Sequence, residues 1–181
     1  PWIMDFFMDM DAFDDQKSHT LEKYKEVFGA DYLQNIPRRY WTHLGGRAVY
    51  TYKDIFPLQP LEKILANPPC DELDDTSHFH IDLYGKYIPG LCSGLAIRME
   101  DLGYPLDEER YPFINMLYNE GIQAFFHYAR KEYGFSPQSK YLNKCHLCNE
   151  IRLFLVREKQ LDFPELKPVG YYQHVDKINV R

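Results

Sequence analysis

The residues with the clearest chemical potential in this chain are its four cysteines. Two of them form a Cys-x-x-Cys pattern, Cys145-His146-Leu147-Cys148, and the other two are Cys70 and Cys92. A Cys-x-x-Cys at the start of a helix places two sulfurs on one side of a tight turn, where unpaired backbone N–H groups and the helix dipole favour thiolate. Thiolates bind Zn²⁺ and iron–sulfur clusters, and both can take four of them. Cys70, Cys92, Cys145 and Cys148 are therefore candidate ligands of one metal or cluster site.

Two other interpretations of the cysteines stay open. They could be reduced, half-buried residues without a ligand, because free Cys is among the most buried residue types. Core cysteines usually lie in periodic apolar segments, however, and only Cys148 approaches that context. A thioredoxin-like redox use of the Cys-x-x-Cys would require a preceding strand in a βαβ pattern, whereas here the pattern follows a polar loop. We favour the metal or cluster site.

Other polar groups offer weaker possibilities. His78, His80 and Asp82 alternate along an expected strand, so they share one face and could form a small mixed metal site or supply a further ligand. A hydrogen-bonded or solvated strand surface explains the same pattern. His146 either shapes the turn between its two cysteines or points to solvent. The aspartates of residues 9–15 are expected to be surface charge, with Mg²⁺ as an open alternative.

The elements that position the cysteines follow from periodicity and from Gly and Pro. Alternation predicts a strand over 78–82, a turn over 84–86 and a second strand over 87–92. This hairpin would carry Cys92 back to the start of its first strand. Cys70 lies a short loop upstream of that start, so the geometry permits the two cysteines to meet. A final helix is expected to begin near Cys145.

The remaining segments are mostly helical in pattern. The final helix is expected to turn Leu147, Ile151, Phe154 and Leu155 inward and Arg152 outward. The other expectations are a helix over 20–28 ending at Gly29, a segment over 31–40 broken by Pro37, a strand or helix over 49–56, a helix over 111–133 bent at Gly121, and an extended tail over 163–181.

Composition limits the class of protein. The chain has 181 residues, with 27 Asp and Glu against 21 Lys and Arg and a formal net charge of −6, which argues against a nucleic-acid partner. No segment reaches the roughly 20 uninterrupted apolar residues of a membrane span, so no membrane partner is expected. The given sequence shows no charged segment followed by an apolar stretch and a small-residue cleavage site, so we expect a reducing compartment, the cytoplasm.

We therefore predict an α+β fold in which helices pack around a small β-hairpin or sheet, with a metal or cluster site formed by four cysteines. Two portions are expected. Residues 1–56 would form a helical N-terminal portion, and residues 57–181 would form the cysteine-containing portion that binds the metal or cluster.

Three stretches of the sequence resemble the cysteine-containing C-terminal extension, called SPASM-like or auxiliary-cluster, of radical SAM proteins. Residues 80–94 match the hairpin pattern His-x-Asp-x-x-Gly-x-x-x-Pro-x-x-Cys-x-Gly. Residues 144–148 match its closing Lys-Cys-x-x-Cys helix, and residues 44–48 are similar to the Gly-Arg-Ala junction that precedes it. The resemblance covers about residues 40 to 158. It implies that Cys70, Cys92, Cys145 and Cys148 hold an auxiliary 4Fe-4S cluster, and that residues 1–56 are a remnant of, or junction to, a barrel domain.

The chain departs from that family in one respect. It has no Cys-x-x-x-Cys-x-x-Cys loop, whose three thiolates bind the cluster that cleaves S-adenosylmethionine in radical SAM enzymes. We therefore expect no catalysis by these residues alone. The expected function is an accessory one, electron transfer or substrate positioning, with the rest of a radical SAM-type polypeptide or a partner enzyme. The alternative is a structural zinc-binding interaction module, with the same four cysteines as ligands and without catalytic activity.

Overall fold

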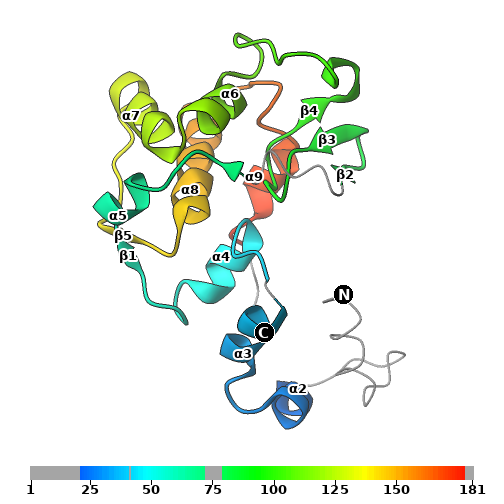
Figure 1. The fold of residues 1–181 in the computed structure, drawn as a ribbon, viewed down its shortest axis with the longest axis vertical. Helices are drawn as coiled ribbons and strands as arrows, with labels where there is room; N and C mark the ends of the chain where they lie inside the picture. Colours follow the sequence, from blue (N-terminus) through cyan, green and yellow to red (C-terminus); the bar gives the residue numbers. More distant parts are fainter. Residues whose placement is uncertain (1–20, 41, 72–78, 178–181) are drawn as a thin grey trace.

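The computed structural model describes residues 21–40, 42–71 and 79–177, and its architecture is α+β (Figure 1). In chain order the elements are α2 (Leu21–Phe28), α3 (Tyr32–Tyr40), α4 (Arg47–Tyr52), β1 (Gln59–Pro60), α5 (Leu61–Leu65), β2 (His80–Ile81), β3 (Lys86–Ile88), β4 (Ile97–Arg98), the 3-10 helix η2 (Met99–Asp101), α6 (Pro112–Asn119), α7 (Ile122–Tyr133), β5 (Lys140–Tyr141), α8 (Lys144–Arg157) and α9 (Val169–His174). The α+β prediction is confirmed.

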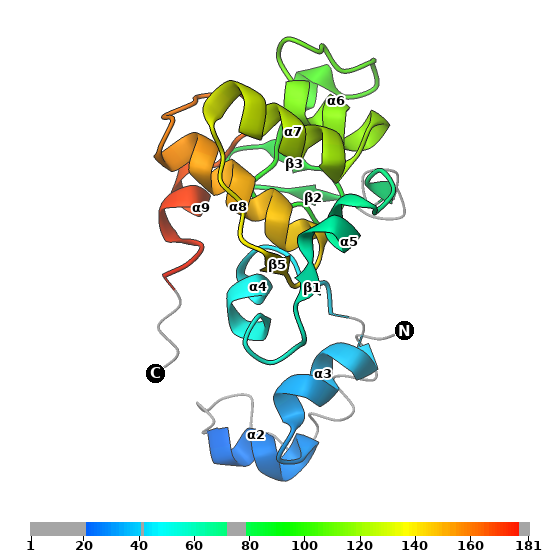
Figure 2. The ribbon, with the colours of Figure 1, turned by 90° about the vertical axis from the view of Figure 1, so that its left-hand side faces the viewer.

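Helix α8 runs through the middle of the molecule, with α7 and α9 packed against it (Figures 1 and 2). Its apolar residues Leu147, Ile151 and Leu155 are fully buried and pack with Phe125 of α7. Full burial of one such side chain contributes about 1.5–3 kcal/mol. The predicted start of this helix near Cys145 is confirmed, and the helix that carries two cysteines is also the centre of the core.

Two small antiparallel sheets flank this core. Strand β1 pairs with β5, and β3 lies between β2 and β4 in a three-stranded sheet. In the latter, His80 faces Ile88 and Tyr87 faces Ile97. The predicted hairpin is confirmed, but its strands are shorter than expected. Because β3 ends at Ile88, before Pro89, Cys92 lies in the loop toward β4 rather than in a strand.

A glycine divides the predicted helix over 111–133 into α6 and α7. Gly121 has φ +86°, a conformation that side chains rarely adopt. A Cβ at this position would lie 3.1 Å from Cα of Pro69, so the loop before Cys70 packs directly on the break. The bend predicted at Gly121 is therefore a full interruption between two helices, and the loop before Cys70 packs against it.

Three local predictions were wrong. Pro37 lies inside α3 instead of breaking it, and the guanidinium carbon of the next residue, Arg38, lies 5.7 Å from the centre of the Phe56 ring in the segment after α4. Pro37 is buried, and burial of its apolar ring offsets part of the local cost of a proline inside a helix. The expected extended tail contains α9, and Tyr172 of this helix is fully buried. Arg152, expected to point outward, is buried with 4% exposure.

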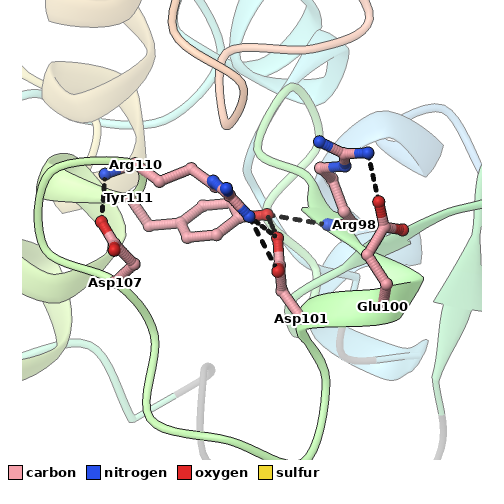
Figure 3. A network of polar contacts seen from close by, with 6 residues as sticks. All are labelled: Arg98, Glu100, Asp101, Asp107, Arg110 and Tyr111. Atoms are coloured by element: carbon pink, nitrogen blue, oxygen red, sulfur yellow. Dashed lines mark hydrogen bonds and ion pairs between the residues drawn. The ribbon is translucent and has the colours of Figure 1, made fainter.

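A polar network fixes the loop between β4 and α6 (Figure 3). The Tyr111 hydroxyl donates to Asp101 at 2.5 Å and accepts from the backbone N–H of Arg98 at 3.1 Å, while Arg110 donates to the same carboxylate at 2.9 Å. These hydrogen bonds, from Tyr111 first and then from Arg110, lower the pKa of Asp101. The network closes the sheet end of the molecule against α6. Within the described ranges, no helix combines the length and the apolarity that crossing a membrane requires.

Candidate metal centre

The first turn of α8 carries Cys145 and Cys148, and hydrogen bonds on both sides hold it in place. Asn143 caps the helix, because its Oδ1 accepts from the backbone N–H of His146 at 2.9 Å. Nδ2 of the same Asn143 donates to the Leu44 carbonyl at 2.9 Å. His146 is buried, and its Nδ1 accepts from the Leu142 N–H at 3.1 Å. Of the two roles expected for His146, the structure bears out the shaping of the turn, and burial lowers its pKa.

Two glycines before α4 lie between the helix start and the Cys92 loop. A Cβ on Gly45 would lie 3.6 Å from Cβ of Cys145, and a Cβ on Gly46 would lie 3.4 Å from Cβ of Ser93, the neighbour of Cys92. Because Gly45 and Gly46 have no side chains, their backbone can approach both α8 and the loop around Cys92 closely. The Leu44–Gly46 turn therefore lies against both Cys145 in α8 and Ser93 next to Cys92.

The Cys70 segment reaches the same end of α8. The backbone N–H of Cys70 donates to the Leu117 carbonyl of α6 at 3.1 Å. The next residue, Asp71, lies 3.5 Å from the Lys144 ammonium at the start of α8. Cys70, Cys92 and Cys148 are all half-buried and pack against the edge of the core. None of the four cysteines is in a disulfide bond.

A buried guanidinium lies between α8 and the Cys92 loop. Nη1 of Arg152 donates to the Ser93 carbonyl at 2.9 Å and to the Tyr172 hydroxyl at 3.1 Å, whereas its Nε is buried without a hydrogen-bond partner. Burial opposes the charge of Arg152, but Tyr172, Cys148, Tyr171 and Cys92 together raise its pKa well above the usual range.

Helix α9 covers this region. The Tyr171 hydroxyl donates to Oδ1 of Asn149 at 2.7 Å, and Nδ2 of Asn149 donates to the Tyr50 hydroxyl at 3.0 Å. The Tyr172 hydroxyl also donates to the Gly94 carbonyl. Three segments far apart in sequence, α4, the loop after Cys92 and α9, are thereby joined through α8.

The donor set fits a thiophilic metal or cluster in kind. All four cysteines are half-buried, and two of them, Cys145 and Cys148, lie in the first turns of α8. Across residues 21–40, 42–71 and 79–177, however, no three Cys, His, Asp or Glu side chains lie close enough together to hold a metal ion. Coordination by all four cysteines therefore requires the cysteine-bearing loops to close further.

The mixed site considered for His78, His80 and Asp82 has a different outcome. His78 lies outside the described residues, and His80 is exposed in β2. Oδ1 of Asp82 accepts from the backbone N–H groups of Tyr84 at 2.8 Å and Lys86 at 2.9 Å. These bonds close the hairpin turn, so Asp82 has a structural role in the turn.

Sequence reasoning missed several residues of the centre. The spacing of Arg152, four residues after Cys148 and seven after Cys145, places all three on one helical face, and this signal could have identified it. His43 lines a cavity of about 230 Å³ together with Cys145, Lys144 and Asn67. No comparable sequence pattern predicts that Tyr171 and Tyr172 pack against α8. Comparison with protein families, with curated proteins and with solved structures finds no match to this chain.

Proposed function

We propose that this chain is the metal-binding accessory portion of a radical SAM-type enzyme, and that Cys70, Cys92, Cys145 and Cys148 hold an iron–sulfur cluster. The observation that carries the proposal is the tethering of the two other cysteine-bearing segments, around Cys70 and Cys92, to the first turns of α8. Asp71 pairs with Lys144, Ser93 lies against the Leu44–Gly46 turn, and that turn lies against Cys145.

In this proposal the site forms fully only when the metal or cluster binds. Metal binding and folding are coupled when the ligands come from separate loops, because the free energy of the metal–ligand bonds offsets the entropy lost when those loops become ordered. Cys145 and Cys148 lie on a capped helix, so we infer that Cys70 and Cys92 approach them when the metal or cluster binds. A 4Fe-4S cluster held there supplies one-electron chemistry. The role of the chain is then to transfer electrons to, or position substrate for, the rest of a radical SAM-type polypeptide or a partner enzyme.

A structural zinc site is the second candidate, and one observation favours it. The four cysteines join segments up to 78 residues apart, from Cys70 to Cys148, around the centre of the core. Closed tetrahedral zinc sites with four cysteine ligands stabilise small folds by linking such segments. In this case the chain is an interaction or scaffold module without catalysis.

Metal analysis of the anaerobically purified chain separates the two candidates. Iron with acid-labile sulfide supports the cluster, and zinc in a colourless protein supports the structural site. Cys148→Ser and Cys145→Ser are expected to weaken binding at least about 100-fold, because one ligand in four carries roughly 3 kcal/mol of a total of about 10–16 kcal/mol.

The matched control is Ser93→Ala, which alters the exposed residue beside Cys92 and removes no sulfur. It is expected to leave the metal content unchanged. Metal content that survives both cysteine replacements would show that the ligands are assigned wrongly. A chain that takes up neither iron nor zinc would refute both candidates.

A further inference from the structure

A pocket of about 450 Å³ lies between the three-stranded sheet and α6. Its walls come from β3 and β4, from the loop between η2 and α6, and from one face of α6 itself. No cysteine contributes to its described lining, so the pocket is separate from the candidate metal centre. Its volume falls in the range of about 300–1,000 Å³ that is typical of small-molecule sites.

The walls of this pocket are rich in aromatic rings. Tyr87 comes from β3, Tyr104 from the loop between η2 and α6, and Tyr118 from α6. Tyr104 and Tyr118 are 75% and 44% exposed, so a ligand can reach both side chains. The faces of tyrosine rings attract organic cations that approach to within about 6 Å of the ring centre. Three tyrosines around one hollow therefore favour a ligand that is both cationic and apolar.

The charge of the pocket has the sign that such a ligand requires. Glu108 is the one charged side chain of the described lining, and it is exposed and forms no ion pair with a described residue. Arg98 at the start of the neighbouring loop is already paired with Glu100 (Figure 3). Arg110 at its end is likewise paired with Asp101, at 2.9 Å. The Glu108 carboxylate is therefore available to a cationic ligand.

A second hollow, of about 240 Å³, continues along α6. It shares Glu108, Asn115 and Asn119 with the pocket and adds Glu120. The described linings of the two hollows contain no Lys, Arg or His. Asn115 and Asn119 lie four residues apart on one face of α6, and an amide oxygen can accept a hydrogen bond from an ammonium group. Acceptors and negative charge thus lie next to the aromatic walls.

The loop that forms one wall is fixed without a ligand. Residues 102–110 are closed off by the Tyr111 hydroxyl, which donates to Asp101 at 2.5 Å (Figure 3). In the middle of the loop, the Leu106 carbonyl accepts from Nδ2 of Asn115 in α6 at 3.4 Å. A pocket that is ordered in advance loses less conformational entropy when a ligand binds. The loop is therefore suited to hold a small ligand.

We infer that this pocket binds a small organic ammonium ion, with its apolar body among the three tyrosines and its cationic head beside Glu108. The charge of the lining selects a cation over an anion, and the aromatic walls select an organic cation over a metal ion. The inference does not rest on the proposed function, because the ligand contacts none of the cysteines.

The test is an NMR titration of the full chain with three probes that share an apolar body and differ in charge: hexylammonium, hexanol and hexanoate. A cation–π contact and an exposed ion pair together correspond to about 3–30-fold in affinity. Hexylammonium is therefore expected to bind about 3–30-fold more tightly than hexanol, and hexanoate is expected to bind most weakly. Equal affinities for hexylammonium and hexanol, or tighter binding of hexanoate, would overturn the inference.

Variants assign the binding to this pocket. Glu108→Gln is expected to lower the affinity for hexylammonium about 2–5-fold and to leave that for hexanol unchanged. The matched control is Glu109→Gln, which removes the same charge from the next exposed residue, outside the lining. It is expected to change neither affinity by more than about 1.5-fold. Equal losses in the two variants would show a general effect of charge and would contradict the site.

A second pair of variants tests the aromatic wall. Tyr104→Leu is expected to lower the affinity for hexylammonium about 2–5-fold, whereas Tyr104→Phe keeps the ring and most of the affinity. Because Tyr104 and Glu108 are exposed, these variants are expected to keep the urea unfolding midpoint of the unmodified chain. Equal affinities of the Leu and Phe variants would refute the role of the ring. A lysine peptide flanked by glycines that binds more than tenfold more tightly than hexylammonium would overturn the assignment to a small molecule.

Discussion

Replacement of Gly94 by alanine tests whether α9 packs closely on the loop after Cys92. Gly94 is buried with φ +88°. A Cβ there would lie 2.5 Å from Cδ1 and Cε1 of Tyr171 and 2.8 Å from Nη1 of Arg152. Gly103 is the matched control, because its φ is +85° and a Cβ would meet no atom within 4 Å.

The two substitutions share one cost and differ in another. The left-handed conformation costs a residue with a Cβ about 1–2 kcal/mol, and both variants bear it. Overpacking adds about 1–3 kcal/mol at Gly94 alone, because the Tyr171 ring and the Arg152 guanidinium must move. Gly103→Ala is therefore expected to destabilise by about 1–2 kcal/mol, and Gly94→Ala by about 2–5 kcal/mol.

Thermal and urea unfolding of the metal-free proteins measure this difference. An additional 1–3 kcal/mol corresponds to a further lowering of Tm by about 2–12 °C for a chain of this length. Hydrogen exchange adds a local readout, since the amides of α9 are expected to lose protection in Gly94→Ala and to keep it in Gly103→Ala. Unfolding free energies of the two variants that agree within about 0.5 kcal/mol would refute the idea that α9 is packed against Gly94.

Two further predictions concern α8 and α6. Asn143→Ala is expected to destabilise the metal-free chain by about 0.5–2 kcal/mol through loss of the α8 cap, and Asn67→Ala, an exposed asparagine that also bonds only to backbone, is the control in urea unfolding. Burial raises the pKa of Glu165 to about 7, against the bonds from Phe113 and Ile114, so the folded state binds this proton more tightly than the unfolded state. Stability is then expected to fall by up to about 3 kcal/mol between pH 4.5 and 7, and a Glu165→Gln variant whose stability falls equally over this range would contradict the assignment.

The elements that sequence predicted well are those set by local signals. Local patterns predicted the start of α8 near Cys145 and the turn over 84–86, and in the structure Asn143 caps that helix and Asp82 closes that turn. Both features are decided within a few residues, so tertiary contacts had little to change. The placement of the Cys70 and Cys92 loops beside α8 depends on contacts between distant segments, and the predicted hairpin gave only a partial indication of it.

The wrong predictions relied on how residue types usually behave in proteins, such as the usual exposure of arginine and the usual effect of proline on regular structure. Arginine is rarely buried, so Arg152 was assigned to the outside although its spacing from Cys148 and Cys145 placed it on their face. The prolines around 163–168 suggested an extended tail, but Pro168 directly precedes α9, where a proline is well tolerated. In each case burial against a distant segment decided the outcome, and a single sequence does not record such contacts.

The Leu44–Gly46 turn also determines where the chain can be cut. The expected division between residues 56 and 57 would separate this turn from α8, yet Leu44 accepts from Asn143, and Tyr50 accepts from Asn149. A fragment that starts at residue 57 would expose the α8 cap and Asn149 to water. A shorter expression product that keeps the centre intact must therefore begin upstream of Leu44, although every cysteine lies downstream of it.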